Sequence, residues 1–261
     1  MASVRGQTLT SACDELRRVT SRRTWAAVAV LAGPPIAYRL AWAWRVRRLR
    51  RSLFAPDVPI ERFDPVAVAD LPGPARRYLK RAVAPGTSLW RTVTFEMRGE
   101  FRLGGRWRSL TARETLTADR GFVWESSVRL GRGGHVSGVD YYVDGEGGQR
   151  FFLAGVVPVV VASGGDVARS AAGRFVGEHV WLPTALVPRD GVEWDAVDGR
   201  RARVRETTTG EAATVTVADD GTLEAVSLRR VRGETGERER FDVTVTETRT
   251  VDGVKVPSQV I

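Results

Sequence analysis

The sequence RFVGEHVWLPTALVP, residues 174–188, contains the second half of the one long helical pattern that lies between strand-like segments, and the predicted fold depends on it. From Asp166 to Val180, apolar or small residues recur at the spacing of one helix face. Asp166 places a negative charge in the first turn, where the helix dipole favours it. Pro183 ends the helix because proline has no backbone N–H. This pattern predicts a helix over about residues 166–182, set between segments that alternate as β-strands do.

Apolar and polar residues alternate from residue 92 onward, and glycine-containing turns separate the alternating runs. One interruption is Glu114, which falls on an otherwise apolar face. We therefore expect a mainly β (α+β) fold, a curved antiparallel meander sheet or half-barrel plugged by the helix over 166–182. A short helix is expected over about 74–83. The last strand, residues 254–261, is expected at an edge of the sheet, where it could pair with a protein partner.

The net charge of +9 is concentrated near the N-terminus. Residues 1–55 hold 11 of the 40 basic residues and 2 of the 31 acidic ones, so the remainder carries 29 of each. Because this remainder is neutral, it lacks the broad basic face that nucleic-acid binding needs, and we expect no nucleic-acid partner. The single cysteine, Cys13, cannot form an internal disulfide, and no Cys/His cluster suggests zinc. We expect no metal and no cofactor.

Residues 24–44 are an apolar stretch interrupted by Arg39, and their 21 residues approach the length of about 20 that a membrane span needs. Tryptophans near both ends are typical of an aromatic belt. The stretch predicts a single-pass transmembrane helix, although Pro34 and Pro35 also allow an amphipathic or disordered arm. Arginines on both sides favour a cytoplasmic sheet domain only weakly.

The predicted organisation has four parts. A basic tail covers residues 1–23, and the transmembrane helix covers 24–44. A basic, Pro-rich linker covers 45–64. The sheet domain follows over 65–261.

Four segments carry a resemblance to a known family: LPGPARRYL (71–79), FVW (122–124), GVDYYVDGEG (138–147) and EHVWLPTALVP (178–188). Over about residues 65–261 the chain resembles an uncharacterised bacterial family of domain-of-unknown-function proteins that often carry one N-terminal membrane span. The resemblance implies a lipoprotein-carrier (LolA/LolB-like) curved sheet whose concave face takes apolar groups. It also implies closing strands, which we expect to be missing after residue 261. The family has no assigned activity, so it implies no catalytic residue.

His179 beside Glu178 is the first candidate for chemistry, because a histidine next to a carboxylate can act as a general acid or base. Alternatively, Glu178 pairs with Arg174 on the solvent face while His179 packs in the core. Adjacent helix residues point about 100° apart, which favours the second interpretation.

Glu114 and Asp140 are the second candidates, since buried carboxylates need partners and often mark function. The alternative is a structural ion pair with Arg98 or Arg150, or a bulge that turns Glu114 outward.

Six aromatic side chains could line one concavity, although each could equally be ordinary core: Phe95, Phe101, Trp124, Phe152, Phe175 and Trp181. We find no phosphate-loop, nucleophile-elbow or HExxH motif. The sequence thus favours a membrane-anchored binding module that holds a lipid or other apolar ligand in the concave face. Its expected ligand-binding residues are Phe95, Trp124, Phe152, Phe175, Trp181, Glu114, Asp140 and His179. The alternative is a hydrolase-type enzyme that uses Glu114, Asp140 or His179 in the same cavity.

Overall fold

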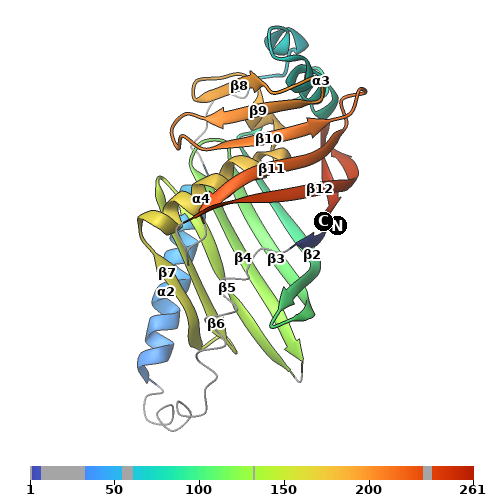
Figure 1. Ribbon diagram of the computed structural model, residues 1–261. Coiled ribbons are helices and arrows are strands. Elements are labelled where there is room, and N and C mark those ends of the chain that lie inside the picture. The colour runs from blue at the N-terminus through green and yellow to red at the C-terminus, as the bar shows by residue number, and fades with distance from the viewer. Residues whose placement is uncertain (1, 7–32, 55–60, 132, 232–236) are drawn as a thin grey trace.

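The structure is a computed structural model that describes residues 2–6, 33–54, 61–131, 133–231 and 237–261. Most of the described residues are in β-strands, as the alternation predicted, and they form two antiparallel meanders (Figure 1). The strands of the first meander are β2 (Thr92–Leu103), β3 (Arg106–Thr117), β4 (Gly121–Gly131), β5 (Gly134–Val143), β6 (Glu146–Leu153) and β7 (Val157–Ser163).

The second meander follows the helix that the sequence predicted. Its strands are β8 (Val192–Ala196), β9 (Arg201–Glu206), β10 (Ala212–Val217), β11 (Leu223–Val231), β12 (Arg238–Val251) and β13 (Val254–Val260). Strand β1 (Ala2–Gly6) lies between β2 and β13 and runs parallel to both, which joins the two six-stranded sheets into one continuous strand order.

Two predictions about the sheet need correction. The single meander that we expected is instead two six-stranded antiparallel meanders joined through β1, because each meander has its own apolar face to bury. The C-terminal strand is not at an edge, since β13 pairs with β12 on one side and β1 on the other. The edges of the described sheet are β7 and β8. The expected docking of a partner along the last strand required that strand to be an edge, and it is not.

Helix α4 (Gly165–Glu178) lies between the two sheets and buries both of its sides. Phe175 packs into the core of the first sheet, whereas Val176 packs into the core of the second. Gly177 allows the helix to approach β11 closely, because a Cβ there would lie 2.5 Å from Cδ2 of Leu228. The helix was expected to continue to residue 182, but it passes into a short 3-10 turn, His179–Trp181, before Pro183.

Helix α3 (Gly73–Ala82) covers the second sheet, and its buried side includes Tyr78 and Leu79. A 3-10 turn, Pro65–Val68, precedes it, and a further one, Pro183–Leu186, follows α4.

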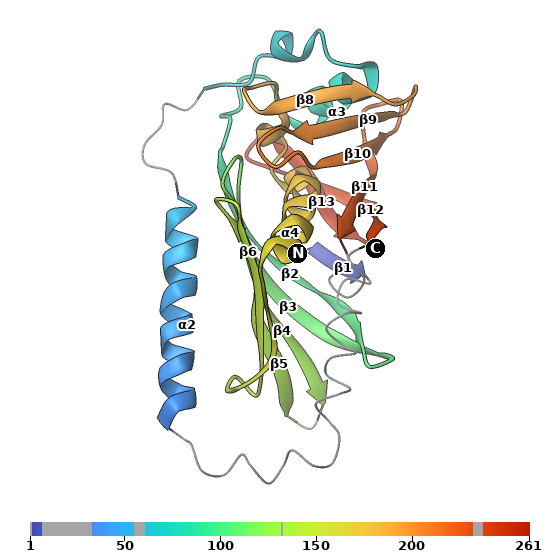
Figure 2. The ribbon, with the colours of Figure 1, turned by 60° about the vertical axis from the view of Figure 1, so that its left-hand side comes forward.

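Helix α2 (Gly33–Ser52) stands against the opposite face of the first sheet from α4 (Figure 2). Three residues of α2, Trp42, Val46 and Leu49, pack against a third core that contains Val139 and Phe152. We call this side the outer face of the first sheet, and the side that contacts α4 the inner face.

The predicted boundaries near the N-terminus differ from those of α2. Residues 24–32 of the expected span lie outside the described residues, and α2 extends to Ser52, well into the expected linker. The helix continues through this arginine-rich segment because arginine is a good helix former. None of the helices in the described part of the chain combines the length and apolar character that a membrane span requires.

Candidate functional site

The strand register brings two predicted carboxylates together on the inner face. Glu114 on β3 lies directly opposite Trp124 on β4, which lies directly opposite Asp140 on β5. Directly opposite residues share one face of a sheet, so both carboxylates flank Trp124 beneath α4. Glu114 is completely buried and Asp140 is 2% exposed. Each therefore needs a partner that offsets the cost of leaving water.

That partner is Arg174, which α4 places over the inner face. Its Nη1 donates to Oδ2 of Asp140 at 2.8 Å, and its Nε donates to Oε1 of Glu178 at 2.5 Å. Its Nη2 lies 3.5 Å from Oε2 of Glu114. We call these four residues the Arg174 cluster. The predicted pairing of Glu178 with Arg174 is present, but it is largely buried and does not lie on the solvent face.

The expected partners of the two carboxylates were wrong. Neither Arg98 nor Arg150 pairs with Glu114 or Asp140 among the described residues. The pairing of β3 with both neighbouring strands is regular at Glu114, so no bulge turns it outward.

Burial dominates the electrostatics of the Arg174 cluster. It raises the pKa of Glu114 well above its usual range, the charge of Glu178 adds to this, and Arg174 opposes it. Burial also raises the pKa of Asp140, again against the effect of Arg174. For Arg174 itself burial alone would lower the pKa, but the three carboxyl groups outweigh burial and raise it. Three carboxyl groups around one guanidinium therefore favour a protonated Glu114.

Some buried polar atoms in and beside the Arg174 cluster have no hydrogen-bond partner among the described residues. A protonated Glu114 hydrogen-bonds Glu178. Within the part of the chain that the structure describes, Oδ1 of Asp140 lacks a hydrogen-bond partner, as does Oγ of Ser126 on the same face. A neutral carboxyl beside an ionised one is the arrangement that general acid–base pairs use. No group of acidic, histidine or cysteine side chains among the described residues is arranged to hold a metal ion.

His179 follows Glu178 in the chain, but its ring bonds to the backbone and it is a core residue. It is 2% exposed, its ring centroid is 4.5 Å from that of Phe175, and its Nε2 is 3.1 Å from the carbonyl oxygen of Thr117. Burial lowers the pKa of His179 to about 4. A neutral, enclosed imidazole of this kind supports the fold.

The predicted aromatic residues divide between the two faces. Phe95 and Trp181 stack with their ring centroids 5.9 Å apart, and the guanidinium of Arg174 lies 4.8 Å from the centroid of Trp124. Phe101 and Phe175 belong to the same inner core. Phe152 does not join them. It lies opposite Ser137 on β5 and faces α2 on the outer side.

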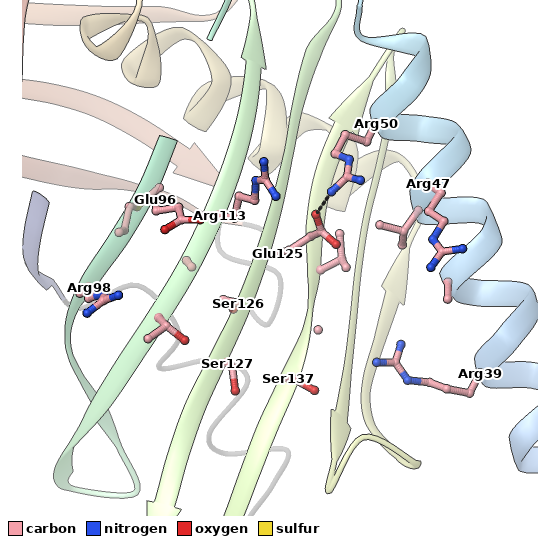
Figure 3. A pocket seen from close by; sticks show the side chains of 17 residues that line it. Arg39, Arg47, Arg50, Glu96, Arg98, Arg113, Glu125, Ser126, Ser127 and Ser137 are labelled. Atoms are coloured by element: carbon pink, nitrogen blue, oxygen red, sulfur yellow. Dashed lines mark hydrogen bonds and ion pairs between the residues drawn. The ribbon is translucent and has the colours of Figure 1, made fainter. Parts of the chain in front are cut away.

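A hollow lies on the outer face, where the sequence predicted no site. It is a pocket of about 640 Å³ between α2 and strands β2 to β5. Five arginines contribute to its lining against two glutamates (Figure 3). They are Arg39, Arg47, Arg50, Arg98 and Arg113, with Glu96 and Glu125. The pocket is therefore strongly basic, although the domain as a whole is neutral.

Only some of these charges are already paired. Arg50 donates to Glu125 at 3.0 Å, and Arg39 donates to the carbonyl oxygen of Gly155 at 2.8 Å. Within the described ranges, Arg47, Arg98 and Arg113 make no hydrogen bond or ion pair. Strand alternation could have placed Arg98 and Arg113 on one face, but nothing in the sequence shows that α2 would cover it.

Comparison with known proteins identifies the chain at the level of a family. No curated protein and no solved structure matches it. A family model of unknown function, DUF6544, matches residues 61–261, which include both sheets from β2 to β13 and the whole Arg174 cluster. The chain therefore belongs to the family of unknown function DUF6544.

Proposed function

We propose that the protein is a membrane-associated binding module for an amphiphile with an anionic headgroup, held in the pocket between α2 and the outer face. The observation that carries this proposal is the excess of arginines over glutamates around a pocket of about 640 Å³. Guanidinium groups without a protein partner are suited to carboxylates and phosphates, which they bind through charge-assisted hydrogen bonds.

The same pocket offers an apolar wall for a hydrocarbon chain. Ala43 and Val46 of α2 and Val139 of β5 contribute to its lining. An amphiphile could therefore direct its charge toward the arginines and its chain along α2. This changes the location that we expected from the sequence, because Phe175 and the Arg174 cluster occupy the inner face.

The exposed side of α2 supports the membrane part of the proposal. Leu40 and Trp44 are 66% and 64% exposed, although both are large apolar residues. The helix contains several arginines and no acidic residue. A helix with exposed apolar and basic side chains is typical of those that lie in the surface of an anionic membrane. The likeness to lipoprotein carriers would fit such a role, but by analogy alone.

Removing the unpaired arginines tests the pocket. We expect the triple variant Arg47→Ala, Arg98→Ala, Arg113→Ala to bind decyl phosphate and decanoate about 10- to 100-fold more weakly than the wild type, because each lost charge contributes roughly 0.5–1 kcal/mol. Isothermal titration below the micellar concentration measures this. Arg203→Ala, an exposed arginine of β9, is the matched control. The proposal is contradicted if wild type and triple variant bind these ligands with equal affinity. It is also contradicted if the wild type binds the cationic decyltrimethylammonium more tightly than decyl phosphate and decanoate.

The membrane contact is tested separately. Leu40→Ser with Trp44→Ser should lower binding to vesicles that contain anionic lipid about tenfold, because partial burial of these side chains contributes on the order of 1–2 kcal/mol. Co-sedimentation measures the bound fraction. Trp107→Ser is the control, since Trp107 is also exposed, at 49%, but lies on β3. Unchanged binding of the double variant counts against α2 as the contact.

The hydrolase alternative stays a prediction. The Arg174 cluster has the paired carboxyl groups that acid–base hydrolysis uses, but Arg174 and α4 occupy the space beside them. No observation on the inner face favours it over binding at the outer pocket.

A further inference from the structure

A row of hydroxyl groups crosses the floor of the outer pocket. Thr111 on β3 lies directly opposite Ser127 on β4, which lies directly opposite Ser137 on β5. All three contribute to the lining of the pocket. The Cβ atoms of directly opposite residues are about 4.5–5.5 Å apart, so the three hydroxyl groups form a short ladder of hydrogen-bond donors across three strands. None of the three makes a hydrogen bond among the described residues.

Unpaired guanidinium groups surround this ladder. Arg98 lies directly opposite Thr111, at the β2 end of the same row. Arg113 occupies the next row along β3, and Arg47 comes from α2 on the other side of the pocket (Figure 3). The hydroxyl donors and the charged donors therefore approach the pocket from different directions.

The two glutamates limit the excess of positive charge. Glu96 and Glu125 lie directly opposite Arg113 on its two sides. Glu125 also accepts the hydrogen bond of Arg50. Five arginines against two glutamates leave a local surplus of three positive charges, which is enough for a group with two negative charges.

We propose that Thr111, Ser127 and Ser137, together with Arg47, Arg98 and Arg113, form a subsite for a phosphate group, so that the anionic headgroup is a phosphate ester. This rests on the proposed function. A carboxylate has two oxygens in one plane, and a single arginine can satisfy both. A phosphate presents oxygens around a tetrahedron, and donors from a floor and from two sides match that shape. Hydroxyl groups are neutral donors that strengthen such a site without adding charge.

The test compares two ligands that share a tail. Decyl phosphate should bind the triple variant Thr111→Val, Ser127→Ala, Ser137→Ala about tenfold or more weakly than it binds the wild type, whereas decanoate should change less than about twofold. Ser109→Ala is the control, because Ser109 lies on the same strand outside the pocket lining. Thr111→Ser, in the background of the two alanines, should restore part of the affinity because it returns one hydroxyl group.

Each result leads to a distinct conclusion. Loss of affinity for decyl phosphate alone supports the subsite, and equal loss for both ligands, or no loss, overturns it. If decyl phosphate and decanoate bind the wild type equally and independently of the hydroxyl groups, the phosphate inference fails while the proposed function stands. If neither ligand binds, the proposed function fails with it. Inorganic phosphate that competes identifies the free anion as a sufficient ligand, and phosphate that does not compete identifies a lipid headgroup. Thermal unfolding of each variant excludes a loss of folding.

Discussion

Replacing Arg174 with alanine is expected to lower the free energy of unfolding by about 3–5 kcal/mol, the range observed when one partner of a buried ion pair is removed. The variant would leave Glu114, Asp140 and Glu178 facing one another without their shared guanidinium. It would also remove the cation that lies over the ring of Trp124. The loss is therefore the cost of unpaired buried charge together with lost packing on the aromatic ring.

Urea unfolding at neutral pH, followed by circular dichroism, measures this loss. Arg169→Ala is the matched control, because Arg169 lies on the same helix and pairs with Asp166 while both side chains are 63% exposed. An exposed pair of this kind contributes less than about 1 kcal/mol. Similar losses for the two variants would show that burial does not set the energy of the Arg174 cluster.

A second variant separates pairing from packing. Arg174→Met with Glu114→Gln and Asp140→Asn keeps the approximate volume of each side chain and removes three of the four charged groups, which leaves Glu178, whose side chain is 12% exposed. It should recover much of the stability lost in Arg174→Ala, since neutral groups of similar size avoid the desolvation cost. If the triple variant is as unstable as Arg174→Ala, the loss of stability comes from the packing of the arginine side chain and not from its charge.

Alternation in the sequence predicted the strands and the burial of Glu114, because neighbouring side chains of a strand point to opposite faces. It could not identify the partner. Arg174 is 60 residues from Glu114 and 34 from Asp140, and no local pattern records which strand a helix will cross.

Phe152 shows a different limit. Phe151 and Phe152 are adjacent, and only one of them can face inward. Phe151 joins the inner core, while Phe152 faces α2. The choice depends on the register between β5 and β6, which a single sequence does not fix. The sequence does not predict the outer pocket for a related reason, because the arginines of α2 have the same pattern as the flank of a membrane span.

The second large effect concerns pH and the variant Glu114→Gln. Burial, followed by the charge of Glu178, raises the pKa of Glu114 well above its ordinary value of 4.5. The folded state therefore binds this proton more tightly than the unfolded state does. The contribution of this proton to the free energy of unfolding is fully present below about pH 4.5. It is lost as the pH rises through the pKa of Glu114 in the folded state. Within that window the loss approaches about 1.4 kcal/mol per pH unit for one proton.

His179 acts in the opposite direction on the pH dependence of each protein, and it is present in both wild type and Glu114→Gln. Its pKa is lowered by burial from 6.5 to about 4, so its contribution to stability is lost as the pH falls from 6.5 toward 4. Above pH 6.5 it is neutral in both states, and its contribution no longer varies. Asp140 has a raised pKa as well, but it is present in both proteins and largely cancels when they are compared.

Comparison of wild type and Glu114→Gln by urea unfolding from pH 5 to pH 9 tests the argument. At the acidic end the two should differ little, because a protonated carboxyl and an amide are alike in size and both are neutral. As the pH rises, it costs the wild type more free energy to keep the proton on Glu114. If Glu114 loses that proton, a further negative charge is buried beside Glu178 and Asp140. The glutamine variant does neither, so it should become the more stable protein by a margin that grows with pH. Glu146→Gln, at an exposed position of β6, should show no such growth. A constant difference between wild type and Glu114→Gln across the range would mean that Glu114 is ionised in the folded protein, and that Arg174 outweighs its burial.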